Sequence, residues 1–394
     1  MDIYNALQEQ KETILAVGMH TTGEPTRIVI RGVDQFLTGT RLLDKRDSAR
    51  HDHDDLRRRI MFEPRGHPEM YGAILVKETE LTRSGEAHIG VLFTHNEGYS
   101  TMCGHATMAL GRFLVDTQDE ETFPNRSKLV HDSKTNTTIV NLHCPCGLVR
   151  ISVPTLLQGD RITYDSSRTV SFLSVPSFAT TIDQEIPIPE EYRWPELGSR
   201  SSVKLDVSYG GAFYAILPAT ELGFSQGLRG ASLSALSHAT AQLKALLMAE
   251  YPKATHHPTE PSLSYLYGVV VVDTEVAADG HETGLCFFAD QQVDRSPTGS
   301  AVAARIALAY AKGKIGLNDA KRYHSVVSLA SEQPEQDAFL GEAVEEVQVE
   351  GGEGPAAKGV VVKTSGRAYY TDAAAFVAEK DDALSAAGFQ VKLP

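Results

Sequence analysis

The feature that most constrains this chain is a short motif that occurs twice. Residues 102–106 (MCGHA) and 297–301 (PTGSA) each place a small reactive or hydroxyl side chain before a glycine, and each opens an alanine-rich apolar run. Cys103 corresponds to Thr298 at an offset of 195 residues in a chain of 394. An offset of half the chain predicts two related halves rather than an array of short repeats.

Both motifs are predicted to be helix N-termini, with Ser296 as the N-cap of the second helix and Pro297 in its first turn. Two helix N-termini facing one cleft would offer free backbone N–H groups and two positive dipole ends to a carboxylate. The same environment lowers the pKa of a thiol in the first turn. We therefore expect Cys103 to be a thiolate near neutral pH, opposite a hydroxyl group from Thr298.

Composition limits the classes of function. A net charge of −14 disfavours nucleic acids and anionic membranes as partners. The N-terminus has no basic region followed by an apolar run, and no apolar stretch approaches bilayer length, so we expect a cytoplasmic protein. The four cysteines are too few for a disulfide framework in a chain of this length and are expected to be reduced.

Two clusters superficially suggest a metal site. Cys144 and Cys146 flank a proline beside His143, but no second cluster with ligand spacing occurs, so buried structural thiols are predicted. The charged run at residues 51–55 (HDHDD) would be scattered around a helix and is interpreted as a solvated face. No metal is assigned.

Strand-like segments at residues 70–76 and 87–93 precede the first motif, and segments at 265–272 and 284–289 precede the second. Strands alternate irregularly with helices and no glycine-rich dinucleotide fingerprint follows a strand, so mixed-sheet α/β domains are expected rather than a Rossmann fold. The alanine-rich segment after Thr371 is predicted to be a helix.

The proline-rich segment 180–202 is the best candidate for a crossover, which divides the chain into residues 1–190 and 191–394. Whether the tail after about residue 360 packs back on the first half is left open. Gly210 and Gly211 interrupt a strand, where they allow a bulge, a close backbone approach to a ligand, or a plain bend.

Three longer motifs, at residues 95–106, 208–214 and 294–300, carry a family resemblance. On these motifs the chain resembles the proline racemase superfamily, and within it the trans-3-hydroxy-L-proline dehydratases. The resemblance implies a diaminopimelate epimerase-like fold, with two pseudo-symmetric domains that each wrap a curved mixed sheet around a central helix, and a site in the cleft between them. It also implies a cofactor-independent hydro-lyase, a small imino-acid substrate and a possible homodimer.

The racemases of the superfamily carry cysteine at both motif positions, whereas this chain has Cys103 and Thr298. A threonine hydroxyl is too weak a base to take a Cα proton at neutral pH, so the resemblance implies β-elimination with Cys103 as the single base. Thr298 would then position or protonate the departing hydroxyl. The resemblance further implies that the backbone of Gly104 and Gly299 and the side chains of His105 and Ser300 hold the carboxylate and ring of the substrate. It also implies that the Asp294 carboxylate pairs with the ring ammonium of the substrate.

Three alternatives stay open at this point. A 4-hydroxyproline 2-epimerase or proline racemase would need a second base other than residue 298. A non-catalytic imino-acid-binding protein would keep the site without turnover. A Cys-His hydrolase would need a base near Cys103, and His105, two residues further along a helix, is expected to point away. Ala301 stands where the dehydratases usually have glycine, and we expect it to be tolerated.

Overall fold

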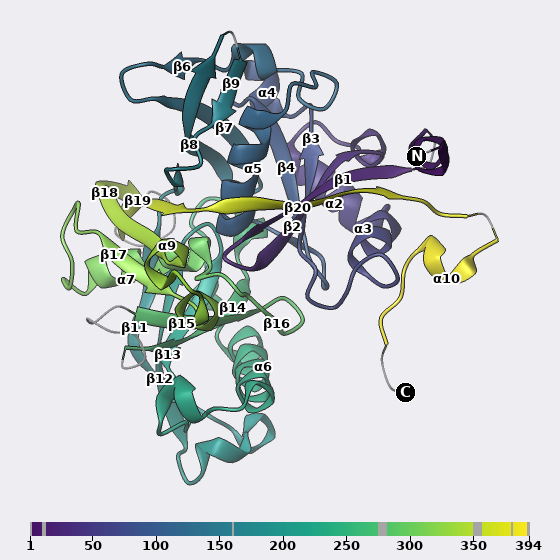
Figure 1. The fold of residues 1–394 in the computed structure, drawn as a ribbon. Helices are drawn as coiled ribbons and strands as arrows, with labels where there is room; N and C mark the ends of the chain where they lie inside the picture. Colours follow the sequence, from purple (N-terminus) through teal and green to yellow (C-terminus); the bar gives the residue numbers. More distant parts are fainter. Residues whose placement is uncertain are drawn as a thin grey trace. The chain divides into compact units, whose positions relative to one another are not determined.

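The computed structural model describes residues 2–9, 13–159, 161–274, 282–349, 357–379 and 381–391. The chain forms two compact units: unit 1 comprises Met1–Phe172 with Arg367–Pro394, and unit 2 comprises Leu173–Gly366 (Figure 1). The division expected after residue 190 falls inside unit 2, between two strands that pair with each other. The proline-rich segment therefore connects neighbouring strands of one sheet.

Unit 1 is built on a mixed sheet with the order β20-β1-β2-β3-β4-β7-β8-β9. The β2–β3 and β4–β7 pairs are parallel and the others are antiparallel. Its strands are β1 (Ile14–Thr21), β2 (Glu24–Arg31), β3 (Gly72–Val76), β4 (Ile89–Thr94), β5 (Tyr99–Ser100), β6 (His131–Asp132), β7 (Thr137–Cys144), β8 (Gly147–Gln158), β9 (Arg161–Tyr164) and β20 (Ala368–Phe376). Its helices are α1 (Asp2–Gln8), α2 (Leu42–His51), α3 (Asp54–Met61), α4 (Glu80–Ser84), α5 (Gly104–Asp116) and α10 (Ala383–Ala386).

Helix α5 is the central helix of unit 1. It packs against β1, β2, β7, β8, β9 and β20, and nearly all of its side chains are buried. Helices α2 and α3 form a second core with β3 and β4, whose residues are buried throughout. A helix packed on so many sides requires small apolar residues, which explains the alanine- and glycine-containing run after Cys103.

Unit 2 has the strand order β11-β12-β13-β14-β15-β17-β18-β19, with parallel β13–β14 and β15–β17 pairs. Its strands are β11 (Phe178–Pro187), β12 (Ser202–Tyr209), β13 (Phe213–Pro218), β14 (Leu266–Asp273), β15 (Glu282–Phe288), β16 (Gln292–Val293), β17 (Lys321–His324), β18 (Phe339–Val349) and β19 (Ala357–Gly366), and the chain enters the unit within β10 (Val170–Leu173). Its helices are α6 (Leu233–Glu250), α7 (Gly299–Ala311), α8 (Val326–Ala330) and α9 (Pro334–Asp337).

The two units repeat one topology. Parallel and antiparallel pairs follow in the same order, and a short hairpin, β4–β5 or β15–β16, leads into the central helix, α5 or α7. Helix α7 packs against β11, β12, β13, β18 and β19, as α5 does against its own sheet. The two related halves and the mixed α/β class predicted from the sequence are thus observed.

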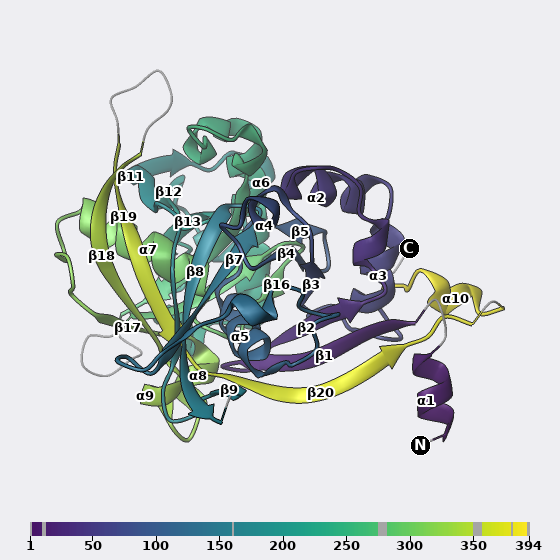
Figure 2. The ribbon, with the colours of Figure 1, turned by 90° about the horizontal axis from the view of Figure 1, so that it is seen from above.

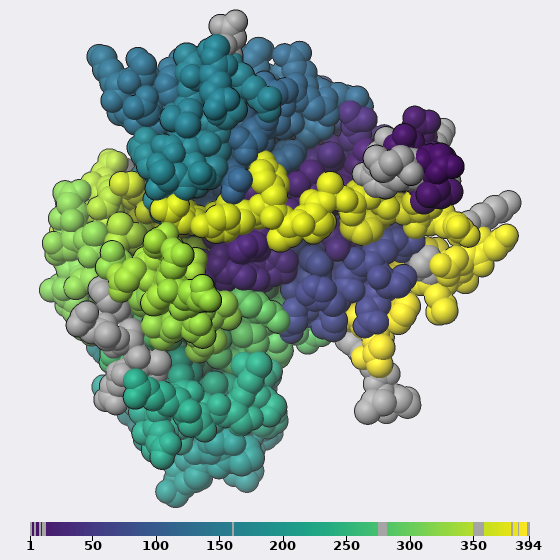
Figure 3. Space-filling model, in the orientation of Figure 1, coloured from purple at the N-terminus to yellow at the C-terminus, as the bar shows by residue number. Residues whose placement is uncertain are grey.

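The outermost strand beside β1 comes from the other end of the chain. Strand β20 pairs antiparallel with β1 from Ile14 to Thr21, and Figures 1 and 2 both show the two strands side by side. In Figure 3 the same strand, in yellow, lies at the surface of unit 1, and Tyr369 to Asp372 are exposed. The helix predicted after Thr371 is wrong, because this strand extends to Phe376 and α10 covers only four residues.

No helix among the described residues is long and apolar enough to cross a membrane.

Gly210, between β12 and β13, lies against the first turns of α7. A Cβ atom at this position would be 2.1 Å from the Ser300 carbonyl oxygen and 2.6 Å from the Ala304 nitrogen. The neighbouring Gly211 has a φ of 96°, which favours glycine. The close backbone approach considered for this pair is therefore an approach to the helix that carries the second motif.

Gly210→Ala is expected to destabilise the protein by about 2 to 3 kcal/mol, because the methyl group would have to displace helix backbone rather than a flexible side chain. Urea denaturation followed by circular dichroism measures this loss. Gly316→Ala is the matched control in unit 2, since a Cβ atom there would make only an ordinary 3.4 Å contact with Asp319. Equal denaturation midpoints for the two variants would contradict the assignment.

Candidate active site

Cys103 is the N-cap residue of α5. Its backbone is extended (φ −146°, ψ 115°), the helix begins at Gly104, and the Ala106 N–H donates to its sulfur at 3.4 Å. The Thr107 hydroxyl and the Thr107 N–H both donate to the Cys103 carbonyl oxygen, at 2.6 and 3.0 Å. The Cys103 side chain is 4% exposed, so its sulfur is buried at the positive end of the helix dipole.

The His105 imidazole lies beside the Cys103 sulfur, with Nδ1 at 3.2 Å and Nε2 at 3.6 Å. The expectation that His105 would point away is wrong, because Cys103 precedes the helix in an extended conformation and helical spacing does not apply to the pair. At this distance a ring N–H can donate to a thiolate, and an unprotonated ring nitrogen can accept the thiol proton. The arrangement pairs the Cys103 sulfur with a ring that can donate a proton to it or accept one from it.

His105 is itself held by its surroundings. The Thr21 hydroxyl donates to the His105 carbonyl oxygen at 2.9 Å, which ties the β1–β2 hairpin to the first turn of α5. The Tyr71 ring packs edge to face on the imidazole, with 4.8 Å between ring centroids. Sequence reasoning placed Tyr71 only in a buried strand, and no local pattern signalled this contact.

The polar loop that precedes β5 is fixed by a buried arginine from α3. Arg57 donates through Nη1 to the carbonyl oxygens of His95 and Asn96, at 2.7 and 3.0 Å, and its other nitrogens bind the Asp54 carboxylate at 2.6 and 2.8 Å. The His95 Nδ1 accepts from two backbone N–H groups of the loop, so Nε2 carries the proton in the neutral ring. Arg57 is 3% exposed, although its neighbourhood in the sequence is highly charged.

Two further cysteines, Cys144 and Cys146, lie at the turn between β7 and β8. Cys144 is buried as predicted, whereas Cys146 is half-buried, and its N–H donates to the Thr101 carbonyl oxygen at 3.1 Å. Burial raises the pKa of the Cys144 thiol well above its ordinary value, and the neighbouring Cys146 and Cys103 raise it further. Within the described ranges, no group of three or more His, Cys, Asp or Glu side chains could hold a metal ion.

Thr298 occupies in α7 the place that Cys103 has in α5. It is the N-cap, with a left-handed backbone (φ 61°, ψ 88°), and it is 6% exposed. The prediction that Ser296 caps this helix is wrong: the Ser296 hydroxyl instead accepts a hydrogen bond from the Thr298 N–H at 3.1 Å. The Thr298 side chain makes no capping hydrogen bond to the helix.

Asp294 and Cys286 lie beside this helix start. The Asp294 N–H donates to the Cys286 carbonyl oxygen at 3.0 Å, and an Asp294 carboxylate oxygen accepts from the Ser296 N–H at 2.7 Å. Burial, followed by the charge of Asp294, raises the pKa of the Cys286 thiol, and a hydrogen bond from Thr298 opposes this only in part. Cys286 is therefore a protonated thiol at neutral pH.

Ser300 and Ala301 form the first turn of α7 with Gly299. The Ser300 and Tyr214 hydroxyl oxygens are 2.7 Å apart, and both side chains are buried. Ala301 is fully buried in α7.

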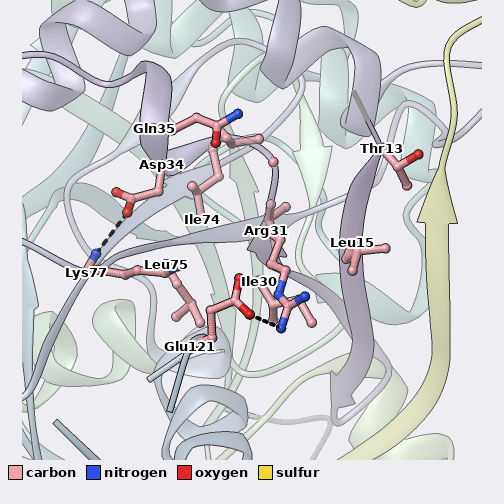
Figure 4. Close-up of a pocket in the computed structure, with 13 residues that line it drawn as sticks. Thr13, Leu15, Ile30, Arg31, Asp34, Gln35, Ile74, Leu75, Lys77 and Glu121 are labelled. Carbon is pink, nitrogen blue, oxygen red and sulfur yellow. Dashed lines mark hydrogen bonds and ion pairs between the residues drawn. The ribbon is translucent and has the colours of Figure 1, made fainter. Parts of the chain in front are cut away.

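The candidate residues lie at two helix starts, one in unit 1 and one in unit 2. Cys103, Gly104 and His105 lie at the start of α5. Asp294, Thr298, Gly299 and Ser300 lie at or just before the start of α7. A separate hollow of about 260 Å³ in unit 1 is lined by residues such as Arg31, Asp34 and Lys77 and by none of the predicted site residues (Figure 4).

The sequence and the fold were compared with known proteins. A family profile described as proline racemase matches residues 16–390. The trans-L-3-hydroxyproline dehydratase of Bos taurus is 41% identical over 371 residues, covering 93% of this chain and 92% of that protein. The trans-3-hydroxy-L-proline dehydratase of Homo sapiens is 41% identical over 369 residues, with the same coverage of 93% and 92%.

Among solved structures, a probable proline racemase from Agrobacterium radiobacter with bound carbonate has a similar fold. Its TM-score is 0.76 at 24% identity, and the match covers 96% of each chain. The match between family profile and sequence extends over both units and both helix starts. The chain belongs to the proline racemase family.

Proposed function

We propose that this chain is a trans-3-hydroxy-L-proline dehydratase. The observation that carries the proposal is the unlike pair of residues at equivalent helix starts, a thiol at Cys103 and a hydroxyl at Thr298. Relatives from two mammals, each 41% identical over more than nine tenths of their length, are named as dehydratases of this imino acid. A single thiol base suffices for elimination, whereas racemization needs a base for each face of Cα.

The reaction begins with removal of the Cα proton by the Cys103 thiolate. The electron pair left on Cα forms a double bond to C3, the C3–O bond breaks, and the hydroxide leaves with a proton as water. The resulting enamine takes a proton at C3 and loses the proton on its ring nitrogen, which gives the cyclic imine 1-pyrroline-2-carboxylate. Atoms and electrons balance without an oxidant or reductant.

His105 and the helix dipole support the sulfur in this step. A ring N–H 3.2 Å from Sγ, the Ala106 N–H 3.4 Å from it and the positive helix end all favour the thiolate over the thiol. After the proton transfer, the unprotonated Nε2 of the neutral ring, 3.6 Å from Sγ, can accept the proton from the sulfur. The Cys103 sulfur therefore returns to its basic form for the next turnover.

Thr298 supplies or positions the proton for the leaving hydroxyl. Its side chain does not cap α7 but forms a hydrogen bond with the Cys286 thiol, which would hold the hydroxyl in place for the substrate. Asp294 is 2% exposed and would pair with the ring ammonium, which compensates the cost of burying its charge. Backbone N–H groups of the first turns, at Gly104 and Gly299, would bind the carboxylate with Ser300.

Two of the alternatives are disfavoured by particular contacts. An epimerase would need a second base near residue 298, and the thiol beside Thr298 is that of Cys286, whose pKa is raised by burial. A non-catalytic binding protein would have no use for the contact between the Cys103 sulfur and the His105 ring. Binding of pyrrole-2-carboxylate without any turnover of trans-3-hydroxy-L-proline would nevertheless favour that function.

A Cys-His hydrolase is the second candidate, because the 3.2 Å contact between Cys103 and His105 also suits a nucleophilic thiolate. A burst of product from an activated ester, with accumulation of an acyl group on Cys103, would favour it.

The dehydratase proposal includes a cytoplasmic location, a homodimer and the absence of a cofactor.

Incubation with trans-3-hydroxy-L-proline is expected to release 1-pyrroline-2-carboxylate, which is detected as the cyclic imine and by loss of one water in mass spectrometry. The reaction should proceed without added cofactor and in the presence of a chelator. Trans-4-hydroxy-L-proline is the matched control, because its hydroxyl is not β to the acidic carbon. Conversion of the control to its C2 epimer, with no imine from the first substrate, would refute the proposal.

Cys103→Ser is expected to lower kcat by about a thousandfold or more, because a serine hydroxyl is almost wholly protonated at neutral pH and cannot replace the thiolate. Steady-state kinetics with trans-3-hydroxy-L-proline measures the change. Cys146→Ser is the control for loss of a half-buried thiol and should retain activity. Turnover by Cys103→Ser at a rate close to that of the unchanged protein would remove Cys103 from the role of base.

Thr298→Cys is expected to introduce exchange of the Cα proton in both enantiomers of proline, at least about tenfold above the unchanged protein, because it supplies a second thiol at the second helix start. Deuterium incorporation from D₂O, measured by mass spectrometry of separated enantiomers, reports each face of Cα. Thr298→Ser, which keeps the hydroxyl, is the control. Exchange confined to one enantiomer in Thr298→Cys would show that residue 298 alone does not decide between elimination and racemization.

A further inference from the structure

Tyr71 connects the Cys103–His105 pair to the sheet of unit 1. Its side chain is 1% exposed, and its carbonyl oxygen accepts a hydrogen bond from the Arg27 N–H at 2.9 Å, which fixes its backbone beside β2. Its hydroxyl oxygen is 2.6 Å from Ser100 Oγ, and Ser100 is itself fixed by pairing with Phe93. The ring is therefore held at both ends, by the backbone and by the hydroxyl.

The fixed ring packs against the histidine that contacts the candidate base. The Tyr71 and His105 rings meet edge to face, with centroids 4.8 Å apart and planes inclined by 69°. On a further side the Tyr71 ring is tilted against His95, at 6.2 Å. Because His105 Nδ1 is 3.2 Å from the Cys103 sulfur, rotation of the imidazole away from Tyr71 would also break the contact with sulfur.

A histidine in the first turn of a helix has several staggered side-chain conformations, and only some bring a ring nitrogen to the N-cap residue. The Thr21 hydroxyl fixes the His105 backbone but does not contact its ring. The edge-to-face contact with Tyr71 acts on the ring itself and restricts its orientation, and such contacts need an aromatic partner.

We propose that Tyr71 is a positioning residue, whose ring, locked by Ser100, holds the His105 imidazole against the Cys103 sulfur. The inference rests on the proposed function for its kinetic consequence, whereas its effect on the reactivity of Cys103 holds for any reaction at this sulfur. A tyrosine that only fills the core would influence stability and leave that reactivity unchanged.

The experiment compares Tyr71→Phe, which keeps the ring, with Tyr71→Leu, which removes it. The rate of Cys103 alkylation by iodoacetamide at neutral pH is measured by peptide mass spectrometry, which separates Cys103 from the other three cysteines. We expect alkylation to be about tenfold slower in Tyr71→Leu, on the scale of an aromatic contact, and about threefold slower in Tyr71→Phe, which keeps the ring but loses the hydrogen bond with Ser100. With trans-3-hydroxy-L-proline, kcat should fall in the same order while KM stays within about twofold.

Tyr323→Leu is the matched control, because Tyr323 is a buried tyrosine of unit 2 whose ring packs against another side chain, the guanidinium of Arg305. It should lose stability without slowing the alkylation of Cys103. Equal alkylation rates in Tyr71→Leu and the unchanged protein would overturn the inference.

Ser100→Ala tests the lock if Tyr71→Leu does not fold. It keeps the ring and frees the hydroxyl, so we expect alkylation to be about threefold slower; an unchanged rate would overturn the inference. If the unchanged protein does not release the cyclic imine, the proposed function fails, and the alkylation rates still decide the role of Tyr71. Normal turnover with equal kinetics in both Tyr71 variants would refute the inference and leave the proposed function standing.

Discussion

The first turn of one buried helix in each unit is the constraint on which the rest depends. Helices α5 and α7 are packed by strands on several sides, so the residue that caps each N-terminus has a fixed place relative to the helix dipole. Cys103 uses its sulfur as the cap acceptor, and Thr298 leaves its hydroxyl out of the cap. A reactive group at a helix end must be held by the fold, because free ends fray.

One topology with two different cap residues explains how a duplicated framework can support an unsymmetric reaction. The framework supplies the same strand order, the same short hairpin and a central helix that follows it in both units. The chemistry differs because a thiol and an alcohol differ in acidity by several pKa units. Burial and the charge of Asp294 raise the pKa of the Cys286 thiol, so this thiol stays protonated beside the second helix start. The asymmetry therefore depends on two side chains and on one local environment.

The sequence predicted the duplication well, but it predicted the boundary between the units and the local orientations poorly. The 195-residue offset, the buried strands before each motif and the helix starts were all readable because they depend on periodicity and composition. The Ser296 cap was wrong because Thr298 adopts a left-handed backbone that no pattern signals. The helix after Thr371 was wrong because pairing with β1 overrides the helix propensity of alanine. Arg57 and Tyr71 were missed because their contacts join residues far apart in the sequence.

The sequence by itself determined the duplication, the mixed α/β class and the place of the two helix starts, because each is a property of residue type and spacing. Only the tertiary structure decided that His105 contacts the sulfur, that Gly210 serves the approach of a turn to α7, that the Tyr71 ring packs on His105, and that Arg57 binds the loop before β5. These facts depend on the direction of side chains and on contacts between distant segments. Such contacts form only when the sheet of each unit closes around its central helix.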